Sequence, residues 1–565
     1  MKMSIGNFLL RRLQEAGVRH IFGVPGDYNL ELMQQLEDRG EPAWIGNCNE
    51  LNASYATDAY ARINGLGALI VTHGVGTLSA INGIAGAYSE HVPVVLISGS
   101  LPLRSVQRGD LMHHTLADRG KGDLCRIFAE VTAAQAQLTP ENAAGEIDRV
   151  ILTAWRRKLP VYLELPSDIS YLEIEVPERS IQLEMIPSDR GNLKTCTEMI
   201  LEKLNAAKSP AFLLDIDAIR FGVSAQIMEL AGRFHMHVAT LNCAKGAVPE
   251  SSPAFVGIYA GVASSAATCE AIEGSDCLLT VGYRRVESTT GFFTDKLPAS
   301  AIHLNSTYVD TTDKNFQGVY LGELLQSVID SSSGMLTNKQ PARPPKHLDF
   351  VPSNDPLTQD AYWKAIQNFL QPGDVIVVED GTSSAGFGRL TLPDDCTYIT
   401  GAYVWCSVGY ATPALLGAIL ASPGRRHILL TGEGSLQMTV QEISTVMRHD
   451  LKPLVFVNQN QGYTVERAVL GKDARYNDIA TWRYSELPTV FSRDNKAETH
   501  VVTTSNELQR VLDSPQSSMV LVECVMDKYD APYDLILGGH AIADTDYGAR
   551  GPQSAVNAQI PMPVR

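Results

Sequence analysis

Short apolar runs of strand length recur along this chain and alternate with longer segments of helical pattern. Nearly every position of these runs is apolar, so their strands must be buried on both faces. Such strands belong to parallel sheets that helices cover on both sides. The pattern therefore predicts an α/β fold. The runs that carry this prediction are residues 68–71, 93–97, 160–165, 212–214, 278–281, 375–378 and 454–457.

Two linkers rich in proline, serine or charged residues interrupt this alternation. One begins at residue 175, and the other runs from 331 to 352. Each follows a completed α/β pattern, which is typical of a domain boundary. With 565 residues, the chain is long enough for about three domains. We therefore expect domains at 1–180, 190–335 and 350–540, followed by a C-terminal tail at 541–565.

The charge balance is acidic, with a formal net charge of −17 and a pI near 5.3. Nucleic acids and anionic membrane surfaces require a basic patch, so neither is expected as a partner. No apolar run reaches the roughly 18 residues of a membrane span, and the first seven residues lack the apolar stretch of a secretory signal. The nine cysteines are scattered without a Cys-x-x-Cys pair, which favours reduced thiols. We expect a cytoplasmic protein.

The segment from 432 to 466 is the most informative part of the sequence. An apolar run ends in the glycine turn Gly-Glu-Gly-Ser at 432–435, which opens onto a helix. Glycine turns at a helix N-terminus bind phosphate, but the carboxylate of Glu433 would repel phosphate unless a cation lay between them. The amides near Asn460 supply the neutral oxygens that a hard cation prefers. The segment therefore predicts a metal-diphosphate site.

Ionisable residues near the N-terminus form a second group of candidates. Asp27 follows a strand, at the edge where α/β active sites gather, although a helix N-cap is the more ordinary role for it. Glu50 opens a helix rich in small residues, where it also suits the helix dipole. These small residues predict close packing against another helix. His113 and His114 are adjacent, which does not suit a metal site, but two imidazoles can transfer protons near neutral pH.

The order of the motifs is more specific than any one of them. They are FGVPGDYNL at 22–30, NELNASYA at 49–56, GVGTLSAINGIAG at 74–86, HHTL at 113–116, GTS at 381–383 and GSLQMTVQEIST at 434–445. In this order they resemble the thiamine-diphosphate-dependent 2-oxo-acid decarboxylases. That group contains the pyruvate, indolepyruvate and phenylpyruvate decarboxylases. The resemblance covers both end domains strongly and the middle one weakly.

This resemblance implies a first domain that binds the aminopyrimidine ring, a non-catalytic middle domain, and a last domain that binds the diphosphate of thiamine diphosphate through Mg²⁺. It implies non-oxidative decarboxylation of a 2-oxo acid to an aldehyde and CO₂ through a thiamine diphosphate enamine. It also implies sites built between subunits. A homodimer at least is therefore expected, with a homotetramer as the full assembly.

The resemblance also assigns roles to residues by position. Glu50 would bond the pyrimidine ring, the backbone carbonyl of Cys406 would hold its amino group, and Val408 would bend the cofactor. The acid–base residues would be Asp27, Glu50, His113, His114 and Glu466. The diphosphate would be lined by Thr382, Gly434 and Ser435, and Mg²⁺ would be held by Glu433, Asn460 and the carbonyl oxygen of Gly462.

Three features depart from the family pattern. Aspartate is usual where Glu433 stands, and the extra methylene moves the carboxylate by roughly 1.5 Å, which predicts a shifted or weaker Mg²⁺ site. Ser384, Ala385 and Val465 predict a wide substrate pocket and a branched or aromatic 2-oxo acid in preference to pyruvate. The segment after Pro532 does not match the helix that usually closes the family's chains.

Two other functions fit the same residues. A carboligase, in which the cofactor-bound enamine attacks an aldehyde, would use the same site and differ only in its product. A non-catalytic structural or regulatory family member is the third possibility. Glu433 and the unusual C-terminal tail favour it, whereas the retention of the acid–base residues opposes it, because a scaffold needs none of them.

Overall fold

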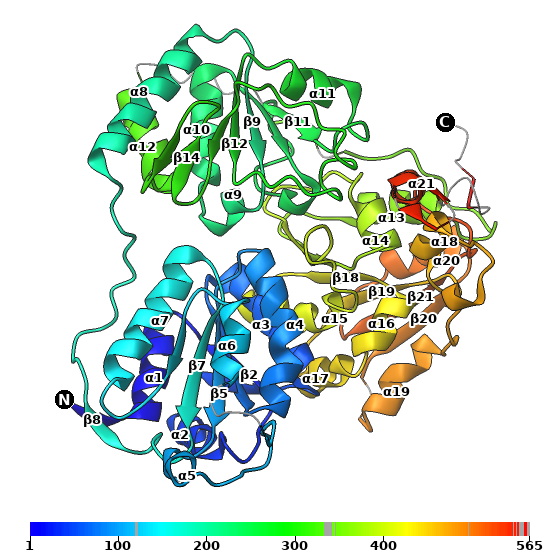
Figure 1. The fold of residues 1–565 in the computed structure, drawn as a ribbon. Helices are drawn as coiled ribbons and strands as arrows, with labels where there is room; N and C mark the ends of the chain where they lie inside the picture. Colours follow the sequence, from blue (N-terminus) through cyan, green and yellow to red (C-terminus); the bar gives the residue numbers. More distant parts are fainter. Residues whose placement is uncertain are drawn as a thin grey trace.

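Three large sheets carry the fold, each built from one of three consecutive parts of the chain (Figure 1). The computed structural model describes residues 1–118, 123–332, 342–344, 346–494, 496–545, 547–549, 551–552 and 559–561. Every strand pair in the first and last sheets is parallel, and helices cover these sheets. The predicted α/β fold is confirmed.

The first sheet has the strand order β3-β2-β4-β5-β7-β6. All residues of the inner strands β4, β5 and β7 are buried, which explains their continuous apolar sequence. Its strands are β2 (His20–Gly23), β3 (Ala43–Gly46), β4 (Gly67–Thr72), β5 (Val94–Ser100), β6 (Gln135–Gln137) and β7 (Val161–Pro166). Its helices are α1 (Ile5–Glu15), α2 (Leu30–Arg39), α3 (Glu50–Asn64), α4 (Val75–Ser89), α5 (Leu103–Arg108), α6 (Asp123–Ala129) and α7 (Ala143–Arg157).

The last sheet repeats this topology, with the order β17-β16-β18-β19-β21-β20. Two domains with the same strand order therefore lie at the two ends of the chain. The strands are β16 (Val375–Val378), β17 (Thr397–Thr400), β18 (His427–Gly432), β19 (Leu454–Gln459), β20 (Glu498–Val502) and β21 (Val520–Val525). The helices that matter for the site are α13 (Gln359–Phe369), α14 (Thr382–Phe387), α15 (Ala411–Ala421), α16 (Glu433–Thr439), α17 (Glu442–Arg448), α18 (Thr464–Val469) and α21 (Tyr533–Thr545).

The middle sheet has the order β11-β10-β9-β12-β13-β14-β15, parallel up to β13 and antiparallel beyond it. Its strands are β9 (Pro210–Leu214), β10 (His237–Thr240), β11 (Phe255–Ile258), β12 (Cys277–Val281), β13 (Ile302–Leu304), β14 (Tyr308–Asp310) and β15 (Asn315–Gln317). Among its helices, α8 (Arg190–Ala206), α10 (Ser224–Phe234) and α12 (Leu321–Ser331) bury apolar side chains in a separate core.

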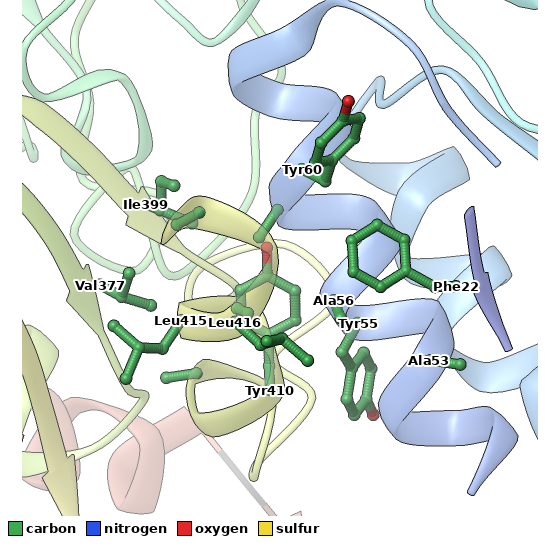
Figure 2. Close-up of a cluster of buried hydrophobic side chains, with 14 of the residues drawn as sticks. Phe22, Ala53, Tyr55, Ala56, Tyr60, Val377, Ile399, Tyr410, Leu415 and Leu416 are labelled. Carbon is green, nitrogen blue, oxygen red and sulfur yellow. The ribbon is translucent and has the colours of Figure 1, made fainter. Parts of the chain in front are cut away.

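A shared core joins the first and last domains, with α3 packed against α15 (Figure 2). Ala53, Ala56 and Ala59 of α3 are fully buried there. A Cβ atom added to Gly417 of α15 would lie 1.9 Å from the carbonyl oxygen of Ala56, so only glycine permits this approach. The predicted close packing of the small-residue helix is confirmed, and the two end domains form one packed unit.

The chain closes with a helix that the sequence analysis did not expect. Tyr533–Thr545 forms α21, which packs on α18 and α14. Gly539 lies against Ala468 of α18, where an added Cβ would come within 2.7 Å of that residue. The helix also crosses residue 540, the expected end of the last domain. In the described part of the chain, no helix is both long and apolar enough to span a membrane.

Candidate active site

The first group of predicted residues gathers where parallel strands end. Asp27 follows β2, Glu50 follows β3, and His73 follows β4, which pairs with β2. Because the carboxyl ends of parallel strands meet at one edge, these side chains are brought to the same side of the sheet. The loop after α5 adds His113 and His114 to this group.

Asp27, His113 and His114 contact one another through His113. The Asp27 Oδ2 atom lies 3.3 Å from His113 Nε2, and the rings of His113 and His114 lie 4.5 Å apart with a T-shaped geometry. Gly74 permits this arrangement, since a Cβ atom there would lie 2.0 Å from the carbonyl oxygen of His114. His113 and Asp27 are both exposed, as a group that exchanges protons with a ligand requires.

Two residues of this group were missed by the sequence analysis, Tyr28 and His73. The Tyr28 ring stacks on His113 at 4.9 Å and meets His73 and His114 edge-on. Burial lowers the pKa of His73 to about 4, with a smaller contribution from His114, so His73 is neutral near pH 7. Tyr28 lies within the motif at 22–30 and His73 directly before the motif at 74–86, but no periodicity marks them. The position of His73 directly after an apolar strand was the available signal.

Glu50 is held at the first turn of α3 by its neighbours. Asn49 caps the helix by accepting a hydrogen bond from the backbone N–H of Asn52 at 2.8 Å. A Cβ atom on Gly76 would come within 2.9 Å of Glu50 Oε1, so Gly76 leaves room for this carboxylate. Glu442 of α17 fixes the same end of α3 by accepting hydrogen bonds from the side chains of Asn47 and Asn52 at 2.8 and 2.9 Å.

The second group lies at the carboxyl edge of the last sheet. Thr382 begins α14 after β16, the turn at 432–435 follows β18, and Asn458 lies near the end of β19. These three strands are neighbours, so their ends lie side by side. The Asn458 amide donates to the Ser383 hydroxyl at 3.4 Å. Gly434 and Ser435 belong to the first turn of α16, where backbone N–H groups can receive a diphosphate.

Glu433 is buried, with 1% of its side chain exposed. Its Oε1 atom accepts a hydrogen bond from the backbone N–H of Gly462 at 2.7 Å, so the carboxylate reaches the loop after β19. Burial raises the pKa of Glu433 to about 7, although hydrogen bonds from the loop backbone act in the opposite direction. The extra methylene noted in the sequence therefore carries the carboxylate to the loop that also holds Asn460.

A divalent cation fits the oxygen atoms found at this edge. Among the described residues, Glu433 Oε2, Asn458 Oδ1 and Gln459 Oε1 are buried side-chain oxygens without a hydrogen-bond partner. Asn460, which follows Gln459 in the sequence, is also buried. Carboxylate and amide oxygens are the donors that Mg²⁺ prefers. Within the described ranges, no cluster of three or more His, Cys, Asp or Glu side chains offers an alternative metal site.

The loop before α15 presents the two remaining cofactor candidates. Val408 is 40% exposed, so its side chain is free to contact a ligand. Cys406 has a positive φ of 54°, which sets the direction of its carbonyl group. Burial raises the pKa of the Cys406 thiol to about 12, so the thiol stays protonated. This agrees with a role for its carbonyl oxygen alone.

The predicted substrate residues lie on α14 and α18. The Ser384 hydroxyl donates to the carbonyl oxygen of Gly381 at 3.1 Å and so is engaged within its own turn. Val465 packs near Gly381, 3.2 Å from the position of an added Cβ. Ala385 is half-buried, and Glu466 is exposed on α18. All four positions therefore belong to the half of the site on the last sheet.

Among the described residues, the Asp27–His113 group and Glu466 lie far apart within one chain, whereas the 405–408 loop contacts α3 and α4 through Ser407 and Trp405. The Asp27–His113 group lies near α2 and α5, whereas α18 with Glu466 lies at the opposite end of the two-domain unit (Figure 1). Exposed apolar side chains lie close in sequence to residues of both halves. They are Leu30, Val75, Leu111 and Leu116 near the first half, and Val408, Met438 and Trp482 near the second.

Comparison with known proteins identifies all three domains. Residues 3–119 match the N-terminal TPP binding domain of thiamine pyrophosphate enzymes, 197–320 the central domain, and 381–522 the C-terminal TPP binding domain. Pyruvate decarboxylase isozyme 2 of Saccharomyces cerevisiae is 35% identical over 96% of this chain and 99% of its own length. The pyruvate decarboxylases of Candida glabrata and Aspergillus terreus are 37% and 38% identical, over 95% and 96% of this chain and 97% of each relative.

Proposed function

The chain belongs to the thiamine-diphosphate-dependent 2-oxo-acid decarboxylases, and from this premise we propose how its two half-sites serve that reaction. Enzymes of this family are carboxy-lyases. When bound, thiamine diphosphate supplies the carbanion that adds to the 2-oxo carbon and the ring that takes up the electrons left by CO₂. The residues of the chain supply binding, orientation and protons.

The placement of Glu50 is the observation that carries this proposal. Glu50 lies in the first turn of α3, and Gly76 leaves space beside its carboxylate. From this position the carboxylate can hold a proton at a ring nitrogen of the aminopyrimidine. Asp27, His113 and His114 lie at the same sheet edge and supply or remove protons from the reacting carbon. Their exposure leaves them free to meet a substrate on the cofactor.

On the last sheet, Thr382, Gly434 and Ser435 line the diphosphate in our proposal, and Val408 supports the bent cofactor. Glu433, Asn460 and the carbonyl oxygen of Gly462 hold Mg²⁺. The buried oxygens without hydrogen-bond partners at 433, 458 and 459 support a cation at this position. Asn458 and Gln459 are additional candidates for its coordination or for ordering its ligands.

We also propose that each site is completed by a second copy of the chain. The Asp27–His113 group and Glu466 lie apart within one chain, and exposed apolar side chains that a partner would cover lie close in sequence to each half. Glu466 would then act over the Asp27–His113 group of its partner. A homodimer is the smallest assembly that forms such sites, and a homotetramer of two dimers follows the resemblance. All nine cysteines are free thiols, which fits the reducing cytoplasm.

Pyruvate is the substrate that the relatives' names favour, and we propose it for this chain. This replaces the expectation of a branched or aromatic 2-oxo acid, which rested on Ser384, Ala385 and Val465 alone. The Ser384 hydroxyl is turned into its own helix turn, which weakens that expectation further. A panel of 2-oxo acids tests the proposal. We expect a higher kcat/KM for pyruvate than for phenylpyruvate, and the reverse order would restore the wide-pocket interpretation.

Calorimetry and product analysis test the proposed function as a whole. Thiamine diphosphate should bind in the presence of Mg²⁺ and bind much more weakly with EDTA. The loaded enzyme should release CO₂ and free aldehyde from pyruvate. Acyloin in place of aldehyde would indicate a carboligase, and absence of cofactor binding would overturn the proposal.

A further inference from the structure

Tyr28 is a buried residue whose hydroxyl group lies within hydrogen-bond distance of two atoms of His113. It is 5% exposed. Its Oη atom lies 3.2 Å from His113 Nδ1 and 3.1 Å from the His113 carbonyl oxygen. Its ring also stacks on the His113 ring at 4.9 Å, with 23° between the planes. The residue therefore contacts His113 by both ring and hydroxyl.

The polar contacts of His113 differ between the protonation states of its imidazole ring. Asp27 Oδ2 faces Nε2 at 3.3 Å, and the Tyr28 hydroxyl faces Nδ1. With a proton on Nε2 alone, the phenol donates its single proton either to Nδ1 or to the carbonyl oxygen. With a proton on Nδ1 alone, Nε2 presents a lone pair to the Asp27 carboxylate.

Beside an Asp27 carboxylate, only the doubly protonated ring satisfies all three contacts together. Nε2–H then faces the Asp27 carboxylate as the cation of an ion pair, Nδ1–H donates to the Tyr28 oxygen, and the phenol donates to the His113 carbonyl. Burial, followed by the negative charge of Asp27, raises the pKa of Tyr28, so the phenol keeps its proton throughout the working range. Tyr28 can therefore act as acceptor and donor at the same time.

We propose that Tyr28 is a positioning residue that holds His113 in its doubly protonated form, with Nε2–H beside the Asp27 carboxylate. His113 is thereby prepared as the proton donor of the site. This inference rests on the proposed role of the Asp27–His113–His114 group. Among the described residues, the other titratable groups around it are His73 from the β4–α4 turn and His114 from its own loop.

The Tyr28→Phe variant tests the inference because it removes the hydroxyl and keeps the stacked ring. Tyr171→Phe, at a tyrosine that is 48% exposed, serves as the matched control. Both holoenzymes are assayed for pyruvate decarboxylation across the pH range, and thiamine diphosphate affinity is measured for each. Loss of a hydrogen bond to a charged group should move the basic limb of the kcat/KM profile by about one pH unit toward lower pH. Cofactor affinity should change by less than about twofold, since no contact to the cofactor is removed.

The outcomes separate this inference from the proposed function. A Tyr28→Phe profile that overlays that of Tyr171→Phe would overturn the inference. Loss of folding or of cofactor binding in Tyr28→Phe would also overturn it, because the proposal gives the hydroxyl no structural role. His113→Phe is the third variant. If it keeps full activity, the proposed role of the histidine group fails. If it is impaired while Tyr28→Phe is unchanged, only the role of Tyr28 fails.

Discussion

The raised pKa of Glu433 predicts that this enzyme binds Mg²⁺ in a pH-dependent way. Burial places the pKa near 7, and the cation binds the ionised carboxylate. With that pKa, about one tenth of the carboxyl groups are ionised at pH 6, about one half at pH 7 and about nine tenths at pH 8. The apparent affinity for Mg²⁺ should therefore rise about tenfold from pH 6 to pH 8, which is about 1.4 kcal/mol of binding free energy.

Calorimetric titration of Mg²⁺ into enzyme saturated with thiamine diphosphate measures this affinity at pH 6, 7 and 8. Glu433→Gln is the reference, because it preserves the size of the side chain and removes its ionisation. Protonation of the cofactor itself affects both proteins equally and cancels in the comparison. The variant should bind Mg²⁺ more weakly at pH 8 and should lose the tenfold rise. The same pH dependence in both proteins would refute the reasoning, because Mg²⁺ would then not release a proton from Glu433 when it binds.

Three further variants follow from the packing of the two half-sites. Gly76→Ala adds a methyl group 2.9 Å from Glu50 Oε1 and should lower kcat by at least about tenfold, whereas Gly145→Ala, with open space around it, should leave kcat unchanged. Glu442→Gln replaces the carboxylate of α17 that accepts hydrogen bonds from Asn47 and Asn52. It should lower the free energy of unfolding in urea by about 1–3 kcal/mol, whereas Glu486→Gln, at an exposed position, should leave it unchanged. Val408→Ala should lower kcat without lowering Tm, because the side chain is exposed in the free chain; an equal loss in Val490→Ala would argue against a specific role.

Much of the architecture could be predicted from the sequence, because its local signals are strong. Strands such as β4 and β16 are buried on both faces, so their apolar runs stand out without knowledge of their neighbours. The glycine turn at 381 follows β16 and the turn at 432 follows β18, and helices begin where expected. The small residues of α3 likewise predicted its close packing, although not that α15 is its partner.

The contacts of the site required the structure, because they join segments that are distant in sequence. Tyr28 meets His113 across 85 residues, and nothing local to either residue marks the pair. From the sequence, the side chain of Glu433 is one methylene too long for the metal-binding turn. In the structure, its carboxylate accepts a hydrogen bond from the backbone N–H of Gly462. α21 was missed because its sequence contains adjacent glycines, which lower helix propensity, whereas packing on α18 requires one of them.

Mixed dimers test most directly the central claim, that each decarboxylase site joins the Glu50 half of one chain to the Glu466 half of another. Glu50→Gln and Glu466→Gln chains are co-expressed with different tags, and CO₂ release from pyruvate is measured for each protein alone and for the mixture. Each variant alone should be nearly inactive. A dimer with one chain of each kind contains one site with both glutamates intact, so random pairing should restore about a quarter of the wild-type activity. A mixture no more active than its components would show that the two halves act within a single chain and would contradict the account.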